Sequence, residues 1–272
     1  MTGEAMNQGS AKGGLRVHPI NTFSDNYVWL IEDGEYAVVV DPGQSQPVLD
    51  ALRNRNLSLT AILLTHHHQD HVGGVGEILA HFPVPVYGPA METLPACDFP
   101  LIEGSLVQLS KPALSLSVLD VPGHTAGHIA FTGQVSEDPV LFCGDTLFVV
   151  GCGRVFEGTP PQMLASLDKL AALAPSTRVY CAHEYTLSNL RWAVHVDPEN
   201  ADLARFEQYA VARRQTGAPT VPSDIELEKR CNPFLRVREP EIVQAATRWA
   251  GRTLSEPAEV FAALREWKNG FK

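Results

Sequence analysis

Residues 65–74 read THHHQDHVGG and directly follow an apolar run, LTAILL. Four of the ten histidines of the chain, and one aspartate, stand in this short segment. Residues two apart in an extended segment point to the same side, so His66 and His68 can face one metal ion. Asp70 and His71 follow where the chain turns into a helix, and they can face a second ion. Imidazole nitrogen and carboxylate oxygen suit borderline metals, so the segment predicts a metal site.

Two ions need more ligands than one segment supplies, and three candidates stand in separate motifs. His124 lies in VPGHTAGH, Asp145 in LFCGDTLF and His183 in VYCAHEYT. Each follows an apolar strand-like run, and a rigid sheet commonly presents functional side chains from such loops. Asp145 is the natural bridge, because one carboxylate has two oxygens to share. His67 points away from its neighbours and is not expected to be a ligand, whereas His128 is expected to support the ligands.

Composition and charge exclude some classes of function. The 272 residues are 44% hydrophobic and 19% charged, which is ordinary for a globular protein. A net charge of -10 argues against non-specific nucleic-acid binding, and no apolar run approaches the roughly 20 residues of a membrane helix. The first 200 residues carry 9 basic and 21 acidic side chains, whereas the rest carry 12 and 10. The less acidic C-terminal part can help to hold an anionic substrate.

The five cysteines are odd in number, widely spaced and free of any CxxC motif. This argues against a disulfide framework and against a cysteine zinc site, and it predicts a reducing, cytoplasmic location. Residues 1–14 are polar and Gly-rich, with no apolar segment behind a basic one. They are therefore expected to form a disordered tail and not a secretory signal.

The first two thirds of the chain alternate β-branched runs, typical of strands, with segments of helical apolar spacing. The strands outnumber the helices and many are bounded by Gly or Pro, which favours two sheets covered by helices. The expected strands are 26–32, 36–43, 59–65, 84–88, 114–123, 128–133, 139–145 and 177–184, and the expected helices are 46–56, 72–82 and 160–173.

The pattern changes beyond about residue 186, where amphipathic helices follow one another and no strand is expected. We therefore predict a mixed α/β domain over residues 15–185 and a smaller helical domain over residues 186–272. The helices expected in the second domain are 199–215, 239–250 and 256–269.

The motifs THHHQDH, GHTAGH, GDTLF and HEYT, in this order, resemble the metallo-β-lactamase superfamily. Further blocks narrow the resemblance to the glyoxalase II (hydroxyacylglutathione hydrolase) family, over about residues 15–272. These blocks are DNY, GDTLFVVGCGRVFEGTPPQM, YCAHEYTLSNLRWAVHVDPEN, TVPSDIELEKRCNPFLRVRE and REWK. The resemblance implies an αββα sandwich with a binuclear site along one edge of the sheets, followed by a smaller α-helical, substrate-binding domain.

The same resemblance implies two sets of metal ligands, which agree with the spacing argument. The ions would be zinc, with iron or manganese as alternatives. The implied ligands are His66, His68 and His124 for the first ion, Asp70, His71 and His183 for the second, and Asp145 as the bridge.

The implied activity is hydrolysis of S-(2-hydroxyacyl)glutathione, typically S-D-lactoylglutathione, to glutathione and D-lactate. This is the second step of methylglyoxal detoxification. Two divalent ions would activate a water for attack on the thioester carbonyl. Asp145 would hold the pair of ions together and Asp70 would help to steer the water. No Ser or Cys nucleophile is needed, and a monomer is expected.

The resemblance also implies contacts with glutathione. Arg154 replaces a lysine that is frequent in the family and keeps its charge, whereas Phe156 replaces a frequent tyrosine and loses a hydroxyl. An alternative is that the basic residues near the C-terminus belong to a solvated helix face. The implied contacts are Arg154, Phe156, Tyr185, Arg265 and Lys268.

Other activities of the same fold remain open at this point. A persulfide dioxygenase would use one iron and would not need a complete second ligand set. A lactonase shares the carbonyl chemistry, because esters and thioesters are attacked in the same way. A non-catalytic binder of thiol conjugates would be expected to have lost some ligands. The full set of seven ligands favours the thioester hydrolase.

Overall fold

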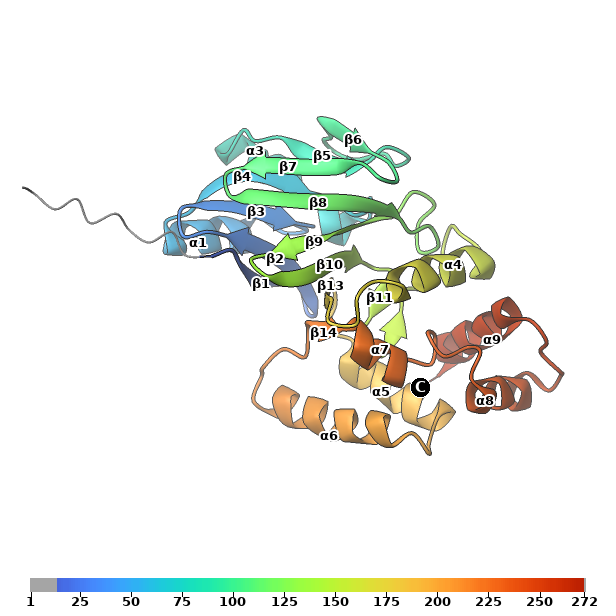
Figure 1. Cartoon of the computed structure of the whole chain (residues 1–272). Helices are drawn as coiled ribbons and strands as arrows, with labels where there is room; N and C mark the ends of the chain where they lie inside the picture. The colour runs from blue at the N-terminus through green and yellow to red at the C-terminus, as the bar shows by residue number, and fades with distance from the viewer. Residues whose placement is uncertain (1–13, 272) are drawn as a thin grey trace, which may run out of the picture.

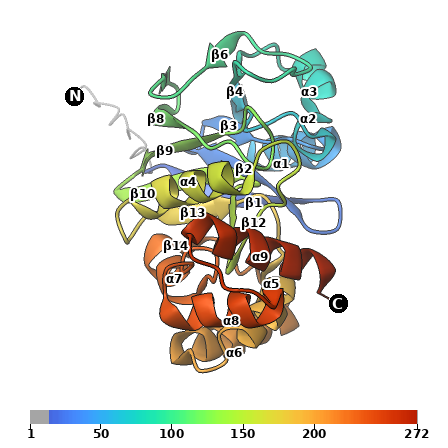
Figure 2. The same cartoon turned by 90° about the vertical axis from the view of Figure 1, so that its right-hand side faces the viewer.

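Two six-stranded sheets face each other and carry helices on their outer faces in the computed structural model, which describes residues 14–271 (Figures 1 and 2). The predicted αββα sandwich with a C-terminal helical region is therefore confirmed. The tail predicted over residues 1–14 lies, apart from Gly14, outside the described residues.

The first sheet has the order β1-β2-β3-β4-β5-β6, and its last four strands run parallel. Strand β2 is buried on both faces. Successive side chains of a strand point to opposite faces of the sheet, and both faces are covered here. Trp29 faces the other sheet, whereas Leu30 faces the outer helices. The strands are β1 Arg16–Thr22, β2 Asn26–Glu32, β3 Tyr36–Val40, β4 Ser58–Leu63, β5 Val86–Pro89 and β6 Phe99–Leu101.

The second sheet has the order β14-β13-β10-β9-β8-β7, and β10 and β13 form its parallel pair. The two-residue strand β14 comes from the C-terminal region, so the expectation of no strand beyond residue 186 is wrong. Strand β14 could not be predicted from alternating apolar and polar residues, because two residues are too few to show such a pattern. The strands are β7 Leu106–Ser110, β8 Ala113–Asp120, β9 Ile129–Val135, β10 Asp138–Gly144, β13 Arg178–Cys181 and β14 Ser223–Asp224.

Helices α1 (Ser45–Arg55) and α3 (Val75–His81) cover the outer face of the first sheet. The helix expected over 72–82 is present as α3, but its predicted start is wrong, because the chain breaks between the short helix α2 (Gln69–Val72) and α3. The two glycines at the break pack against the loop before α1. A Cβ on Gly74 would lie 2.7 Å from the carbonyl oxygen of Pro42, so only glycine fits there.

Helix α4 (Pro160–Ala171) covers the second sheet. Thr159 begins it with a capping box, in which its side chain accepts from the Gln162 N–H. Met163 and Leu167 are fully buried on the sheet side of this helix. The capping motif and the apolar spacing explain why this helix was predictable.

The C-terminal helices form a layer beneath the sheets in Figure 1. They share one continuous apolar core with the sandwich. Helices α5 and α7 were not predicted from the sequence, and neither was the small hairpin β11-β12 (Leu147–Phe148 and Gly151–Cys152). The helices are α5 Thr186–Val196, α6 Ala201–Gln215, α7 Ile225–Cys231, α8 Pro240–Ala250 and α9 Pro257–Gly270.

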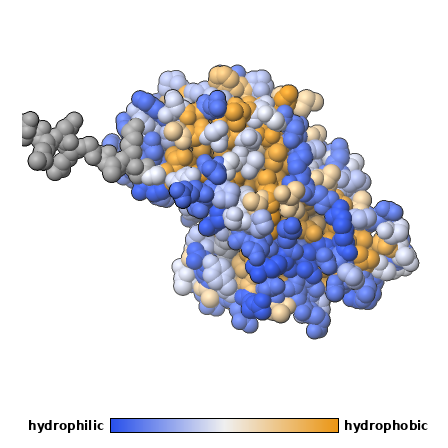
Figure 3. Space-filling view, viewed as in Figure 1, coloured by the Kyte–Doolittle hydropathy of each residue, from blue (hydrophilic) through white to orange (hydrophobic). Residues whose placement is uncertain are grey.

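The face seen in Figure 3 has a hydrophobic region on the sandwich and a hydrophilic region on the helical layer. Hydrophobic residues gather over the region of β7 and β8, and hydrophilic residues gather over the region of α7. In the described part of the chain, no helix has the length and apolar character needed to cross a membrane. The five cysteines form no disulfide within residues 14–271, and four of them are buried.

A candidate metal centre and its pocket

The seven predicted ligands meet at one edge of the sandwich, although they come from distant segments. His66 and His68 follow β4, and His124 lies in the loop after β8. Asp145 follows β10 and His183 follows β13. Helix α2 carries the remaining two, Asp70 and His71. The ends of strands from both sheets therefore build the cluster.

The first predicted group is compact. Nitrogens of His66, His68 and His124 all lie within 4.8 Å of one another. His124 Nε2 and His68 Nδ1 are 3.0 Å apart. Ring nitrogens that converge in this way form a suitable set of ligands for one cation.

The second group lies beside the first, and Asp145 stands between them. Nitrogen and oxygen atoms of Asp70, His71 and His183 also lie within 4.8 Å of one another. Asp145 Oδ2 is 3.3 Å from His124 Nε2 in the first group. Asp145 Oδ1 is 3.4 Å from His71 Nε2 and 3.3 Å from His183 Nε2 in the second. One carboxylate thus turns one oxygen towards each group.

Three polar atoms at the centre support a metal site independently of the motifs. His66 Nε2, His71 Nε2 and Asp145 Oδ1 are buried and have no hydrogen-bond partner among the described residues. A buried polar atom without a partner costs about 1–3 kcal/mol. Three such atoms that face one small volume are explained by cations that bind them, so the residues present fit the metal ions implied by the family.

In three of the histidines, the ring nitrogen that points away from the centre has a hydrogen-bond partner, which aims the other nitrogen at the centre. His71 Nδ1 lies 3.1 Å from Asp41 Oδ2, and His183 Nδ1 lies 2.8 Å from Asp25 Oδ1. His124 Nδ1 donates to the carbonyl oxygen of Arg154 at 2.8 Å.

Asp41 is the most connected of these supporting residues. Besides His71, it accepts from the N–H and the hydroxyl of Thr65 at 2.8 and 2.7 Å. The Thr65 hydroxyl oxygen in turn lies 3.1 Å from His66 Nδ1. Sequence reasoning missed Asp41, Asp25 and also Asn26, whose side chain donates to Asp70 at 3.0 Å. An aspartate directly after an apolar strand was the available signal for Asp41.

Two further histidines lie next to the cluster. His67 points away from it, with Nδ1 2.8 Å from Glu92 and Nε2 3.4 Å from Glu157. His128 is fully buried behind it and accepts the N–H of Asp145 at 3.1 Å. Both lie where the sequence placed them, one turned away and one in support.

The protonation of the cluster suits metal binding. Burial lowers the pKa of His66 well below its usual value, so this imidazole stays neutral. Burial disfavours the Asp145 carboxylate, but His71 and His183 outweigh burial and hold its pKa well below the usual range. For His71, burial lowers the pKa but Asp145 raises it more, so a proton occupies the ring without metal. Metal binding would release that proton.

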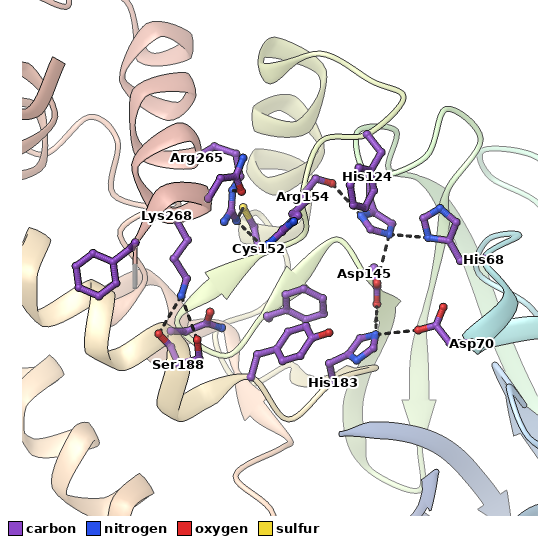
Figure 4. Close-up of a pocket in the computed structure, with 16 residues that line it drawn as sticks. His68, Asp70, His124, Asp145, Cys152, Arg154, His183, Ser188, Arg265 and Lys268 are labelled. Carbon is purple, nitrogen blue, oxygen red and sulfur yellow. Dashed lines mark hydrogen bonds and ion pairs between the residues drawn. The ribbon is translucent and has the colours of Figure 1, made fainter. Parts of the chain in front are cut away.

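A cavity of about 540 Å³ opens from the His/Asp cluster, called the metal cluster below, towards α5 and α9 (Figure 4). Five predicted ligands border it, so a bound molecule can reach the cluster. The structure brings all five predicted substrate contacts to the same cavity. These are Arg154, Phe156, Tyr185, Arg265 and Lys268.

The end of the cavity away from the metal cluster is cationic. Arg265 is only 7% exposed, and its Nη1 donates to the carbonyl oxygen of Cys152 at 2.8 Å. Lys268 Nζ donates to the carbonyl oxygen of Ser188 at 2.9 Å. Within residues 14–271, neither of these cations, nor Arg154, pairs with a carboxylate. The alternative of a solvated helix face is therefore wrong for Arg265.

Burial and neighbouring positive charge both disfavour the protonated form of Lys268. Burial, followed by Arg265, Arg191 and Arg154, lowers the pKa of Lys268 to about 8. The ring of Tyr185 stacks on His183 with centroids 4.6 Å apart, and burial raises the pKa of its phenol. The cavity therefore offers positive charge and a neutral hydroxyl group to an anionic ligand.

The two-sheet sandwich and its His/Asp cluster define a class, the metallo-β-lactamase superfamily, whose family model matches residues 21–183. The model described as "Hydroxyacylglutathione hydrolase C-terminus" matches residues 184–271. Hydroxyacylglutathione hydrolases from Nitrosomonas europaea and Alkalilimnicola ehrlichii are 50% and 56% identical to the chain. The chain belongs to the hydroxyacylglutathione hydrolase family.

These likenesses extend over nearly the whole chain. The Nitrosomonas match spans 258 residues, 95% of this chain and 97% of the relative, and the Alkalilimnicola match spans 252 residues, 92% and 97%. A solved structure described as TTHA1623 in a di-iron-bound form is 28% identical, with a TM-score of 0.56. That match covers 80% of this chain and 100% of the other.

Proposed function

We propose that the protein is a metal-dependent hydrolase of S-(2-hydroxyacyl)glutathione, typically S-D-lactoylglutathione. One observation carries this proposal: a single cavity has a metal cluster at one end and unpaired cations at the other. A glutathione thioester has a reactive carbonyl at one end and carboxylates at the other. The products are glutathione and a 2-hydroxy acid such as D-lactate, which is the second step of methylglyoxal detoxification.

The centre would hold two divalent ions, zinc or alternatively iron or manganese. One ion would be held by His66, His68 and His124 and the other by Asp70, His71 and His183, and Asp145 would contribute to both. Support comes from the two groups of converging atoms and from the di-iron form described for the TTHA1623 structure. When bound, the ions supply a hydroxide at neutral pH and polarise the thioester carbonyl.

Asp70 orients the attacking water. Its Oδ2 faces Asn26, His71 and His183, and its side chain is 40% exposed towards the cavity. Burial raises the pKa of this carboxyl, but the contact with His183 and the other neighbours outweighs it, so Asp70 stays anionic. Its second oxygen is then available to accept a hydrogen bond from water and so to orient it.

Departure of the thiolate needs little help, because a thiol with a pKa of about 8.5 is a good leaving group. Tyr185 keeps its proton and can donate a hydrogen bond to the bound peptide. Arg154, Arg265 and Lys268 bind the glutathione carboxylates. Phe156, which is 61% exposed at the mouth of the cavity, offers an apolar surface and no hydroxyl.

The two parts of the chain divide this work. Residues 15–185 form the catalytic domain, and residues 186–272 form the helical substrate-binding domain. The protein acts as a monomer in the cytoplasm, and this rests on the cysteine pattern and on the apolar core that closes within one chain. The complete second ligand group speaks against a persulfide dioxygenase with one iron, and the cationic end of the cavity speaks against a lactonase.

The test is an assay of metal-loaded protein on S-D-lactoylglutathione, together with the metal content per chain. The matched control is the D-lactoyl thioester of N-acetylcysteamine, which has the same carbonyl but no peptide carboxylates. We expect kcat/KM on the control to be lower by at least about tenfold, the effect of one charge-assisted hydrogen bond. Equal rates on both thioesters, or no hydrolysis of the glutathione thioester, would refute the proposal.

A further inference from the structure

The hairpin β11-β12 connects the metal cluster to the substrate end of the cavity. The chain leaves Asp145, passes through the hairpin among the C-terminal helices, and returns to Arg154 (Figure 4). The N–H of Gly153 donates to the carbonyl oxygen of Thr146 at 3.1 Å, and this hydrogen bond joins the two ends of the hairpin. The hairpin therefore lies in the chain between Asp145 and Arg154, which both border the cavity.

The turn of this hairpin is strained. Val150 has a φ of 53°, in the left-handed region that a β-branched residue rarely adopts. A two-residue turn with a positive φ only at its second central residue normally has glycine or asparagine there. Here the turn residues Val149 and Val150 are 1% and 0% exposed. A strained backbone persists only where its surroundings hold it.

Three buried side chains from the C-terminal region hold the turn. Glu228 Oε2 accepts the N–H of Val150 at 2.9 Å. Asn232 Nδ2 donates to Glu228 Oε2 and to the carbonyl oxygen of Gly151, both at 2.9 Å. Asn189 Nδ2 donates to the carbonyl oxygen of Val149 at 3.0 Å. Glu228 and Asn232 are both 0% exposed.

The hairpin in turn holds groups of the substrate cavity. The carbonyl oxygen of Cys152 accepts from Arg265 Nη1 at 2.8 Å. The ring of Phe148 packs edge-on against Tyr185, with centroids 5.3 Å apart. Displacement of the hairpin would therefore move Arg265 and the ring that borders Tyr185.

We propose that Glu228 and Asn232 are positioning residues for substrate binding, which hold the strained β11-β12 turn so that Arg154 and Arg265 lie at the cavity. This rests on the proposed function, because these cations bind the glutathione carboxylates. Neither residue touches the metal cluster or lines the cavity. The role is therefore to set substrate affinity and not metal binding.

Glu228 and Asn232, which we call the clamp, offer a matched pair of variants at Glu228. Glu228 Oε2 makes both contacts, whereas Oε1 takes no part in them, and the Ser223 hydroxyl group lies beside the same carboxyl group. Glu228→Gln can keep an oxygen towards Val150 and turn its amide towards Ser223. Glu228→Ala removes the acceptor altogether.

The experiment measures KM, kcat and metal per chain with S-D-lactoylglutathione. We expect Glu228→Ala to raise KM about tenfold, because a displaced arginine loses one charge-assisted hydrogen bond to a substrate carboxylate. The values of kcat and metal content should stay nearly unchanged. Glu228→Gln should stay within about threefold of wild type. Ile225→Val, which removes one buried methyl group from the same helix, serves as the control for a general loss of stability. An unchanged KM in Glu228→Ala, or an equal rise in Ile225→Val, overturns the proposal.

A second arm tests the strain directly. Glycine adopts a φ of 53° without strain. In Val150→Gly the turn should therefore keep its conformation with less support from Glu228 and Asn232. We expect Glu228→Ala with Val150→Gly to have a KM closer to wild type than Glu228→Ala alone, and additive losses would overturn the role in holding the turn. Binding of S-methylglutathione, measured by calorimetry, gives the same comparison without turnover. If wild type binds this thioether but hydrolyses no thioester, the proposed function fails while the clamp is still tested.

Discussion

Asp145 is the residue on which both groups of ligands depend, because it turns one oxygen towards each. Its Oδ2 faces His124, and its Oδ1 faces His71 and His183 at 3.3–3.4 Å. If Asp145 bridges the two ions as proposed, Asp145→Ala removes a ligand from each ion and leaves three buried histidines without their carboxylate. We expect the purified variant to retain less than one ion per chain, measured by elemental analysis, and to lose at least about 100-fold in activity, since loss even of a residue that only orients a ligand costs 10–100-fold.

A matched control lies at the other end of the same strand. Asp138 begins β10 and is exposed, so Asp138→Ala changes the same charge without touching the cluster. It should keep the metal content and the activity of wild type. A fully metallated, active Asp145→Ala variant would contradict the bridging role.

At the scale of residues, the sequence predicted which side chains converge at the centre, but not the groups that hydrogen-bond to them. His66, His68, Asp70 and His71 stand together in the sequence, so spacing alone placed them near one centre. Asp41 supports His71 from 30 positions away. Its place directly after an apolar strand is a signal for a functional loop residue, but the sequence does not show which side chain it contacts. Its role appears only when the fold brings it within hydrogen-bond distance.

At the scale of elements, α9 carries the residues that test the substrate end of the cavity. Arg265 and Lys268 are three positions apart and share one face of the helix. Their contacts with a carboxylate form equally in bound substrate and transition state, so their loss should raise KM and leave kcat nearly unchanged. For Arg265→Ala with Lys268→Ala we expect about a ten- to hundred-fold loss of kcat/KM at low salt. An unchanged KM at low salt would remove α9 from the site.

The pKa of Lys268 adds a pH dependence to the same helix. Burial and the neighbouring arginines lower this pKa to about 8. Lys268 is therefore charged below about pH 8 and neutral above it, so its attraction for a carboxylate is lost as the pH rises through 8. KM measured from pH 7 to pH 9 should rise more steeply in wild type than in Lys268→Arg, because arginine stays protonated. Parallel pH profiles would show that Lys268 does not bind the substrate.

The elements that sequence analysis missed share a physical reason. β11, β12 and β14 have two residues each, too short for an alternating pattern. The break between α2 and α3 depends on a loop that packs against Gly74, which the apolar spacing does not reveal. Helix α4, by contrast, has both a capping box and a buried stripe. Elements with a strong local signal were predictable, and those defined by distant contacts were not.

At the scale of the whole molecule, the sandwich and the helical layer share one core. Phe142 of β10 belongs to the same buried cluster as Trp192 of α5 and Phe261 of α9. Trp192 is fully buried and stacks on Phe234, with centroids 4.9 Å apart. The division of the chain at residue 185 therefore does not separate two independent hydrophobic cores. Neither part can expose its side of this core without a large hydrophobic cost.

This continuity predicts that the two parts unfold together. Three of the four tryptophans lie in the C-terminal helices and Trp29 lies between the sheets, so fluorescence reports mainly on the helices. Hydrogen exchange of the β9 and β10 amides reports on the sandwich. As denaturant is added to the metal-loaded protein, both probes should give the same midpoint, because coincident transitions are the mark of a cooperative unit. Tyr209, exposed on α6, offers a control: Tyr209→Ala should leave the two midpoints coincident. A helical transition at clearly lower denaturant than the loss of sheet protection would show that the substrate-binding layer folds independently.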